Sequence, residues 1–218
     1  MTCPFPETEE GTFSLSAMDK IVELAQRMDT LAIGPGMSRH PQTQEMVREL
    51  LPRIPLPVVV DADGLDALAG HTEILEKRSA PTIITPHPGE FSRITGASTR
   101  EVTENSLEIS SDFAREKGCV VVLKVAPALV TDGKRFYLNT TGNPGMATGG
   151  SGDVLTGAVV ALLGQKFDPF FAARMAVWAH GKAGDLACEE KGETGMIASD
   201  ILERLPHAFK WLESHSKG

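Results

Sequence analysis

Residues 139–159 read NTTGNPGMATGGSGDVLTGAV, a glycine-rich stretch with one carboxylate, Asp153, that leads into an apolar run. The apolar residues recur at helical spacing, so a core helix is predicted to begin near Ser151. Glycines before a helix N-terminus let backbone N–H groups turn toward a ligand, and the helix dipole favours an anion there. The stretch therefore predicts either a phosphate-binding turn or a plain strand-to-helix turn with Asp153 as a first-turn carboxylate. No Lys-Ser or Lys-Thr pair follows the last glycine before the helix, so it is not a P-loop.

Around this stretch, short apolar segments alternate with helical patterns. The segments VVV, TII and VVV are continuously apolar and β-branched, which is typical of strands covered by helices on both faces. The alternation predicts an α/β layered fold with a mostly parallel sheet. The expected strands are residues 30–34, 57–63, 81–88 and 119–124, and residues 127–132 and 135–140 form a hairpin. The expected helices are residues 16–28 with Ser16 as N-cap, 41–51, 64–68 and 101–117, followed by three more toward the C-terminus.

Length, charge and cysteine usage exclude several classes of protein. A chain of 218 residues is long enough for one domain with a real core. Its net charge of −8 argues against nucleic acid and anionic membranes as partners. The three cysteines follow no metal-ligand pattern and fit a reducing compartment, and the acidic N-terminus is no targeting peptide. We expect a single-domain cytoplasmic protein spanning residues 1–218, with no membrane segment.

Polar and glycine-bearing groups follow four of the predicted strands. They are GPG at residues 34–36, DADG at 61–64, TPHPGE at 85–90, and Lys124. In an open parallel sheet, ligands bind outside the carboxyl ends of the strands. Each group alone is ordinary turn chemistry, but together they predict one site at one edge of the sheet.

The motifs just described resemble one enzyme family. The segments TGNPGMATGGSGDVLTG, AIGPGMS, VVVDADGLDAL, TPHPGEF, VWAHGKAGDLA and GMIASDILERLP are similar to the ADP/ATP-dependent NAD(P)H-hydrate dehydratase branch of the ribokinase-like superfamily. The resemblance runs in order from about residue 29 onward. It implies a ribokinase-like three-layer α/β fold with a mostly parallel central sheet. We expect the N-terminal portion of the family domain to be absent from this chain.

The resemblance also implies roles for particular residues. Asp153 is implied to be the catalytic base and to contact the hydrated nicotinamide together with Gly36 and His87. The adenine nucleotide is implied to be bound by a strand-end segment and by glycines before the helix, namely Lys124, Val125, Ala126, Pro127, Ala128, Gly149, Gly150 and Gly152. A purely structural role stays open as the alternative. His87 lies between two prolines, and a rigid turn there also explains it.

Other polar residues received no assigned role. Asp61 and Asp63 are able to chelate magnesium, but Asp63 before Gly64 is equally a helix N-cap, so neither is assigned as a metal ligand. Glu90 is equally explained as a first-turn helix charge, and His180 as a hydrogen-bonded core histidine.

The implied reaction is nucleotide repair. The S epimer of hydrated NADH or NADPH is phosphorylated on its ring hydroxyl by ADP or ATP with Mg²⁺, and phosphate is then eliminated. We expect a homo-oligomer, a dimer or tetramer, and an epimerase acting on the same substrate as a partner. Two alternatives remain: a small-molecule kinase of the same superfamily, for a vitamin precursor or a sugar, and a non-catalytic nucleotide-binding relic.

Residues 124–128, KVAPA, depart from the Lys-Gly sequence usual in the family at this strand end. Val125 has a branched Cβ where a glycine would let the backbone approach a ligand, and Pro127 lacks an N–H. We predict that adenine nucleotide binding is weakened by about 1–3 kcal/mol. The double change Val125→Gly and Pro127→Ser should tighten ADP binding roughly ten- to a hundredfold, as measured by calorimetry. Equal affinity in both forms would mean that this segment does not touch the nucleotide.

Overall fold

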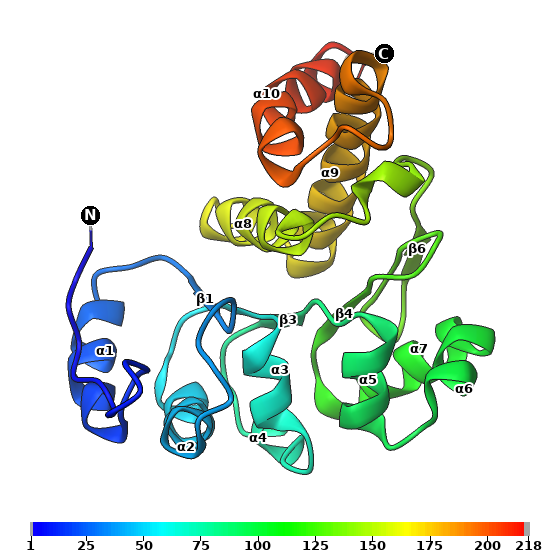
Figure 1. Cartoon of the computed structure of the whole chain (residues 1–218). Coiled ribbons are helices and arrows are strands. Elements are labelled where there is room, and N and C mark those ends of the chain that lie inside the picture. The colour runs from blue at the N-terminus through cyan, green and yellow to red at the C-terminus, as the bar shows by residue number, and fades with distance from the viewer. Residues whose placement is uncertain (1, 216–218) are drawn as a thin grey trace.

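The computed structural model describes residues 2–215 and shows a six-stranded sheet between two layers of helices (Figure 1). Four strands run parallel in chain order, and the last two complete an antiparallel hairpin. The strands are β1 (Leu31–Ile33), β2 (Val58–Val60), β3 (Thr82–Ile84), β4 (Val120–Leu123), β5 (Leu129–Thr131) and β6 (Phe136–Leu138). The predicted mostly parallel α/β sheet and its terminal hairpin are confirmed.

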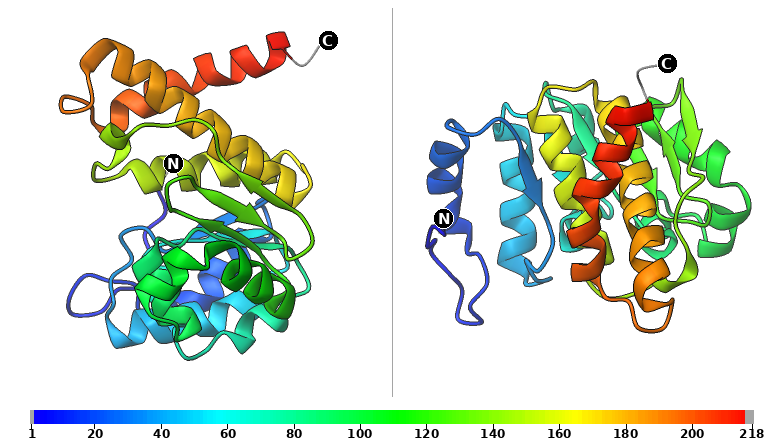
Figure 2. Two further views of the ribbon diagram at one scale, coloured as in Figure 1. Left: turned by 90° about the vertical axis from the view of Figure 1, so that its right-hand side faces the viewer. Right: turned by 90° about the horizontal axis from the view of Figure 1, so that it is seen from above.

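Helices cover both faces of this sheet, as Figures 1 and 2 show. The layer on one face contains α1 (Met18–Ala25), α2 (Pro41–Leu50), α3 (Asp63–Leu68), α4 (Glu73–Glu76), α5 (Pro88–Thr95), α6 (Thr99–Glu104) and α7 (Ser106–Lys117). The opposite layer contains α8 (Ser151–Gly164), α9 (Pro169–Lys191) and α10 (Ala198–His215). Short 3₁₀ turns lie at Leu15–Ala17, Leu51–Arg53 and Pro144–Met146. Within residues 2–215, no helix is both long and apolar enough to cross a lipid bilayer.

The core is divided in two by the sheet, and the central strands contribute to both halves. In β2, Val58 and Val60 pack with one helical layer, whereas Val59 packs with the other, and all three are fully buried. Alternate residues of a strand point to opposite faces, so a strand covered on both sides must be apolar at every position. This explains the unbroken VVV sequence.

Two predicted helices differ from the observed ones. The helix expected over residues 16–28 occupies Met18–Ala25, and the Ser16 hydroxyl pairs with that of Ser14 instead of capping a helix. The helix expected over residues 101–117 is two helices, because Asn105 has a non-helical backbone (φ −117°, ψ 35°). Its first part begins earlier because Ser98 forms a capping box with Glu101.

Two short helices were missed. The strand expected over residues 81–88 ends at Ile84, and α5 begins at Pro88, where a proline is well tolerated as the first helical residue. Helix α4, only four residues long, falls where no pattern was recognised. Both are shorter than the window over which helical periodicity can be read reliably.

The carboxyl ends of β1 and β2 approach each other unusually closely at Gly34. Its φ is +126°, and a methyl group on its Cα would lie 1.7 Å from the backbone oxygen of Asp61. Only glycine adopts this conformation readily and leaves room for the neighbouring backbone. The turn after β1 is therefore packed directly against the first residue after β2.

Replacing Gly34 should be far more costly than replacing a glycine whose only requirement is its backbone angle. Gly70 has φ +77° and nothing within 4 Å of an added methyl group, so it is the matched control. Gly34→Ala should lower the free energy of unfolding by about 3 kcal/mol or more, and Gly70→Ala by about 1 kcal/mol. Urea unfolding measures both; equal losses would contradict the close approach.

Candidate active site

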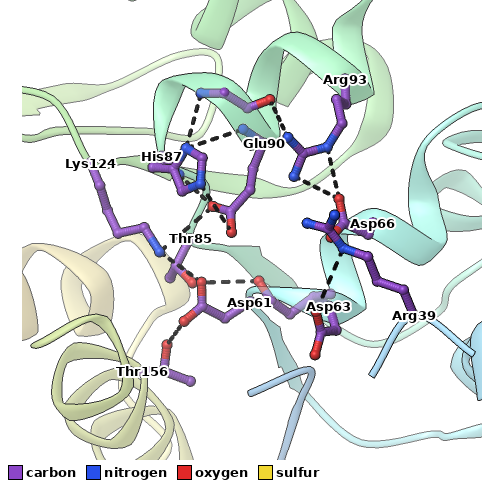
Figure 3. A network of polar contacts seen from close by, with 12 residues as sticks. Arg39, Asp61, Asp63, Asp66, Thr85, His87, Glu90, Arg93, Lys124 and Thr156 are labelled. Carbon is purple, nitrogen blue, oxygen red and sulfur yellow. Dashed lines mark hydrogen bonds and ion pairs between the residues drawn. The ribbon is translucent and has the colours of Figure 1, made fainter. Parts of the chain in front are cut away.

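A buried carboxylate, Asp61, joins three elements at the carboxyl edge of the sheet (Figure 3). Asp61 directly follows β2 and is 1% exposed. Its Oδ1 accepts a hydrogen bond from Lys124 Nζ, after β4, at 2.8 Å, and its Oδ2 accepts one from Thr156 Oγ1, in α8, at 2.7 Å. A methyl group on Gly152 would lie 3.5 Å from Lys124 Nζ and 3.9 Å from Asp61 Oδ2. The first turn of α8 thus lies beside this ion pair.

His87 and Glu90 form a capping box at the start of α5. The amides of Gly89 and Glu90 donate to His87 Nδ1, and the His87 amide donates to Glu90 Oε2 at 2.7 Å. Because Nδ1 accepts these bonds, the neutral ring carries its proton on Nε2. The His87 side chain is about half exposed, and its Nε2 lies 3.6 Å from Glu90 Oε1, the carboxylate that completes the same cap. The structural interpretation of His87 as part of a rigid turn is therefore supported by its helix cap, and its contact with the nicotinamide stays a prediction.

Glu90 also faces the ion pair. Its Oε2 lies 3.8 Å from Lys124 Nζ, and its side chain is 9% exposed. Two buried carboxylates, Asp61 and Glu90, therefore lie on either side of one ammonium group. This arrangement concentrates negative charge around a single cation at the sheet edge.

Acidic residues of α3 hold the turn that contains Gly36. The Ser38 amide donates to Asp63 Oδ2 at 2.8 Å. Asp66 pairs with Arg39 at 2.6 Å and with Arg93 of α5 at 2.7 Å (Figure 3). Asp63 is the first residue of α3, and its carboxylate binds the backbone of the neighbouring turn. The turn after β1 is tied to the helix that begins beside His87.

A cavity of about 940 Å³ opens beside Lys124. It is bounded by the loop before α8, by the start of α8 and by residues of α9. Predicted site residues that line it are His87, Lys124, Val125, Ala126, Pro127, Ala128 and Gly152. Gly36, Gly149 and Gly150 are not among its lining residues. The structure thus brings most of the predicted nucleotide segment together in one cavity, although their ligand contacts stay a prediction.

Asp153 lies next to this cavity but faces a different one. Its side chain is exposed and lines an apolar groove between α8 and α10, with Val154, Gly157, Leu205 and Phe209 among its neighbours. It lies in the first turn of α8, where the helix dipole stabilises a carboxylate. The catalytic role expected of Asp153 stays a prediction, and the structure places its carboxylate at the N-terminal end of α8.

His180, in α9, is the hydrogen-bonded core histidine that its apolar helix indicated. Its Nε2 lies 3.0 Å from the backbone oxygen of Ser151, the first residue of α8. Burial lowers the pKa of His180 to about 4; the bond to Ser151 opposes this shift and the positive charge of Lys124 adds to it. His180 is therefore neutral near pH 7 and donates from Nε2 to the Ser151 carbonyl.

Sequence reasoning left several of these groups without a role. Asp61 was considered only as a metal ligand, Glu90 only as a helix charge, and Thr156 not at all. One signal was present: a carboxylate directly after a fully apolar strand is buried unless the chain turns outward, and a buried carboxylate needs donors. Thr156, a polar residue in an apolar helix, was the matching donor.

Comparison with known proteins gives a consistent result. Residues 3–207 match a family model described as NAD(P)H-hydrate dehydratase. The chain is similar to the bifunctional NAD(P)H-hydrate repair enzyme Nnr of Moorella thermoacetica, with 46% identity over 98% of this chain and 40% of that protein. The chain thus spans well under half the length of the curated relatives it matches.

Solved structures agree in fold. An ADP/ATP-dependent NAD(P)H-hydrate dehydratase from Bacillus subtilis, co-crystallised with ATP and Mg²⁺, is 34% identical, with a TM-score of 0.76, over 87% of this chain and 69% of that one. Ribokinase from Arabidopsis thaliana shares the fold at 18% identity, with a TM-score of 0.59, over 92% of this chain and 61% of that one. The expected ribokinase-like three-layer fold is confirmed.

The buried His180 should make stability depend on pH. Its folded-state pKa of about 4 lies below the ordinary value of 6.5, so the unfolded chain takes up a proton first as the pH falls. Stability is thus fully present above the ordinary pKa and is lost as the pH falls toward the folded-state value, by up to about 1.4 kcal/mol per pH unit. His180→Gln should remove this part of the pH dependence of the free energy of unfolding. Urea unfolding of the two proteins, compared at pH values between the folded-state pKa and the ordinary pKa, measures the difference. Identical pH profiles would show that His180 is not buried in its neutral form.

Proposed function

Because the chain belongs to the NAD(P)H-hydrate dehydratase family, we propose that it converts the S epimer of hydrated NADH or NADPH back to the reduced dinucleotide, using ADP or ATP. The observation that best supports this at the site is the meeting of Lys124, the buried Asp61 and Gly152 beside a cavity large enough for a nucleotide. A small-molecule kinase does not account for a match to the NAD(P)H-hydrate dehydratase model over residues 3–207. The turnover assay described below separates an active enzyme from a non-catalytic relic.

The cavity is lined by both polar and apolar groups. Lys124 and the N-terminus of α8 are among its lining, and a positive charge and unpaired helix N–H groups favour phosphate oxygens. Ala126, Pro127 and Val177 also line it and contribute apolar surface, which suits a nucleobase. We place the phosphates beside Lys124 and Gly152, and the base against the apolar segment.

The residues present fit a magnesium ion that arrives with the nucleotide. Mg²⁺ typically takes one or two carboxylates and completes its shell with waters and substrate phosphates. Asp61 and Glu90 would hold it, since each carboxylate oxygen can accept more than one contact. Among residues 2–215, no group of three or more His, Cys, Asp or Glu side chains could hold a metal ion, so we expect waters and substrate phosphates to complete the shell. When bound, the ion would neutralise charge on the phosphates.

Asp153 supplies the proton acceptor. As the hydroxyl of the hydrated ring attacks the terminal phosphorus of the nucleotide, its proton passes to the Asp153 carboxylate and the bond from that phosphorus to the nucleotide breaks. Lys124 stabilises the charge that collects on the phosphate oxygens. In the second half, the C–O bond breaks and phosphate leaves with its electron pair, while the adjacent ring carbon loses a proton to the departing phosphate. The electron pair of that C–H bond restores the ring double bond. The half-exposed ring of His87 orients the nicotinamide portion.

Two expected partners belong to this proposal. Hydration makes the ring carbon a stereocentre, so a site that fits the S epimer depends on an epimerase to supply it from the other epimer. A homo-oligomer, dimer or tetramer, and the single domain over residues 1–218 stay predictions.

The direct assay mixes hydrated NADH with ADP or ATP and Mg²⁺ and follows recovery of the absorbance of the reduced ring. Absence of recovery with either nucleotide would contradict the proposed function.

Asp153→Asn tests the proton acceptor. The amide keeps the size of the side chain but cannot take the proton, so turnover should fall about 10²–10⁴-fold. ADP affinity, measured by calorimetry, should change little, because the phosphates meet Lys124 and backbone N–H groups. The matched control is Asp19→Asn, since Asp19 is also an exposed first-turn carboxylate, in α1. Near-normal turnover of Asp153→Asn, or an equal loss in the control, would rule out this role.

A further inference from the structure

Helix α9 holds the glycine-rich loop, residues 139–150, through hydrogen bonds. Thr141 Oγ1 donates to the backbone oxygen of Trp178 at 2.9 Å. Asp185 accepts from the Gly142 amide and from Asn143 Nδ2, each at 3.0 Å. One stretch of α9 therefore holds the loop that leaves β6 and lines the cavity.

Two glycines of α9 allow this contact. A methyl group on Gly181 would lie 2.3 Å from Thr141 Oγ1, and one on Gly184 would lie 2.3 Å from Met146 Sδ. Real Cβ atoms do not come so close to other heavy atoms, so the loop can lie this near only because α9 has no side chains there. The apolar helix and the loop are fitted together along nearly two turns.

His180 continues this contact to the start of α8. It is 8% exposed, and its Nε2 lies 3.0 Å from the Ser151 oxygen and 3.3 Å from Ser151 Oγ. A carbonyl oxygen only accepts, so the ring must donate to it. Ser151 directly precedes Gly152 and Asp153, which are the nucleotide-facing glycine and the proposed proton acceptor. Whatever moves Ser151 moves both.

We propose that His180 is a positioning residue, which holds the first turn of α8 so that Gly152 meets the nucleotide phosphates and Asp153 meets the ring hydroxyl. This rests on the proposed function. His180 also lines the cavity, but its Nε2 is bonded to Ser151, so we assign its effect to the position of this turn and not to a contact with the reacting atoms. A displacement of a reacting group by about 1 Å can cost on the order of a hundredfold in rate, so a turn that has lost one of its anchors should be a poor catalyst even in a folded protein.

The test compares two replacements of similar size. His180→Leu removes the donor, whereas His180→Gln places an amide N–H where Nε2 was. We expect His180→Leu to lose about ten- to a hundredfold in kcat and to bind ADP about tenfold more weakly. His180→Gln should recover most of both losses. The control is Ile74→Val in α4, a buried core change in the helical layer on the other face of the sheet, which should lower the melting temperature. Its ADP affinity and kcat should stay normal.

Hydrogen exchange separates this proposal from the proposed function. Amides of residues 148–153 should exchange faster in His180→Leu than in the parental protein, and His180→Gln should reverse the change. Unchanged exchange, or normal kcat and ADP affinity in His180→Leu, would overturn the positioning role. Failure of the parental protein to turn over hydrated NADH would instead contradict the proposed function, and the exchange comparison would still decide whether His180 holds the turn.

Discussion

The carboxylate of Asp61 is the constraint on which the arrangement of the site depends. Taking a charge out of water costs several kcal/mol unless donors replace the lost hydration. Lys124 Nζ and Thr156 Oγ1 replace it on the two oxygens, one from the end of β4 and the other from α8. The helix that carries the glycine-rich turn cannot slide on the sheet without leaving a buried charge unpaired. A single side chain thereby sets the distance between the lysine and the helix N-terminus.

Close backbone packing supports this junction. Gly34 brings the end of β1 against the backbone of Asp61, and an added methyl group on Gly64 would lie 2.9 Å from the backbone oxygen of Ile33. On the opposite face, Gly181 and Gly184 bring α9 against the loop before α8. The absence of a side chain at these four positions is what lets the sheet edge, the loop and the helices converge.

Several groups serve the fold and the site at once. His87 accepts two amide bonds through Nδ1 and thereby caps α5, while its half-exposed ring brings Nε2 to 3.6 Å from Glu90 Oε1. Glu90 completes the same cap and also faces Lys124. A structural role and a ligand-binding role are therefore not alternatives for these residues. Caps form at helix N-termini, and in a parallel sheet those termini lie at the edge where ligands bind.

Local pattern was sufficient for the main elements. Continuous β-branched runs predicted the buried strands, Asp132-Gly133 the hairpin, and the spacing after Gly152 the helix from Ser151, because each depends on neighbours within a few residues. The alternation of strands and helices was also sufficient to predict the edge of the sheet at which the polar groups meet. Short pieces such as α4 and the break at Asn105 did not, since tertiary packing decides them.

The sequence by itself determined the family, the order of strands and helices, and the residue types available for phosphate binding. Only the tertiary structure decided which of them meet. Asp61 and Thr156 are 95 residues apart, and His180 and Ser151 are 29 apart. A local signal can mark a residue as buried and in need of a partner, but it does not identify the partner, because these bonds form only after the sheet and both helical layers have packed. The same is true of Asp153, whose side chain faces the groove between α8 and α10 because of the direction in which the first turn of α8 begins.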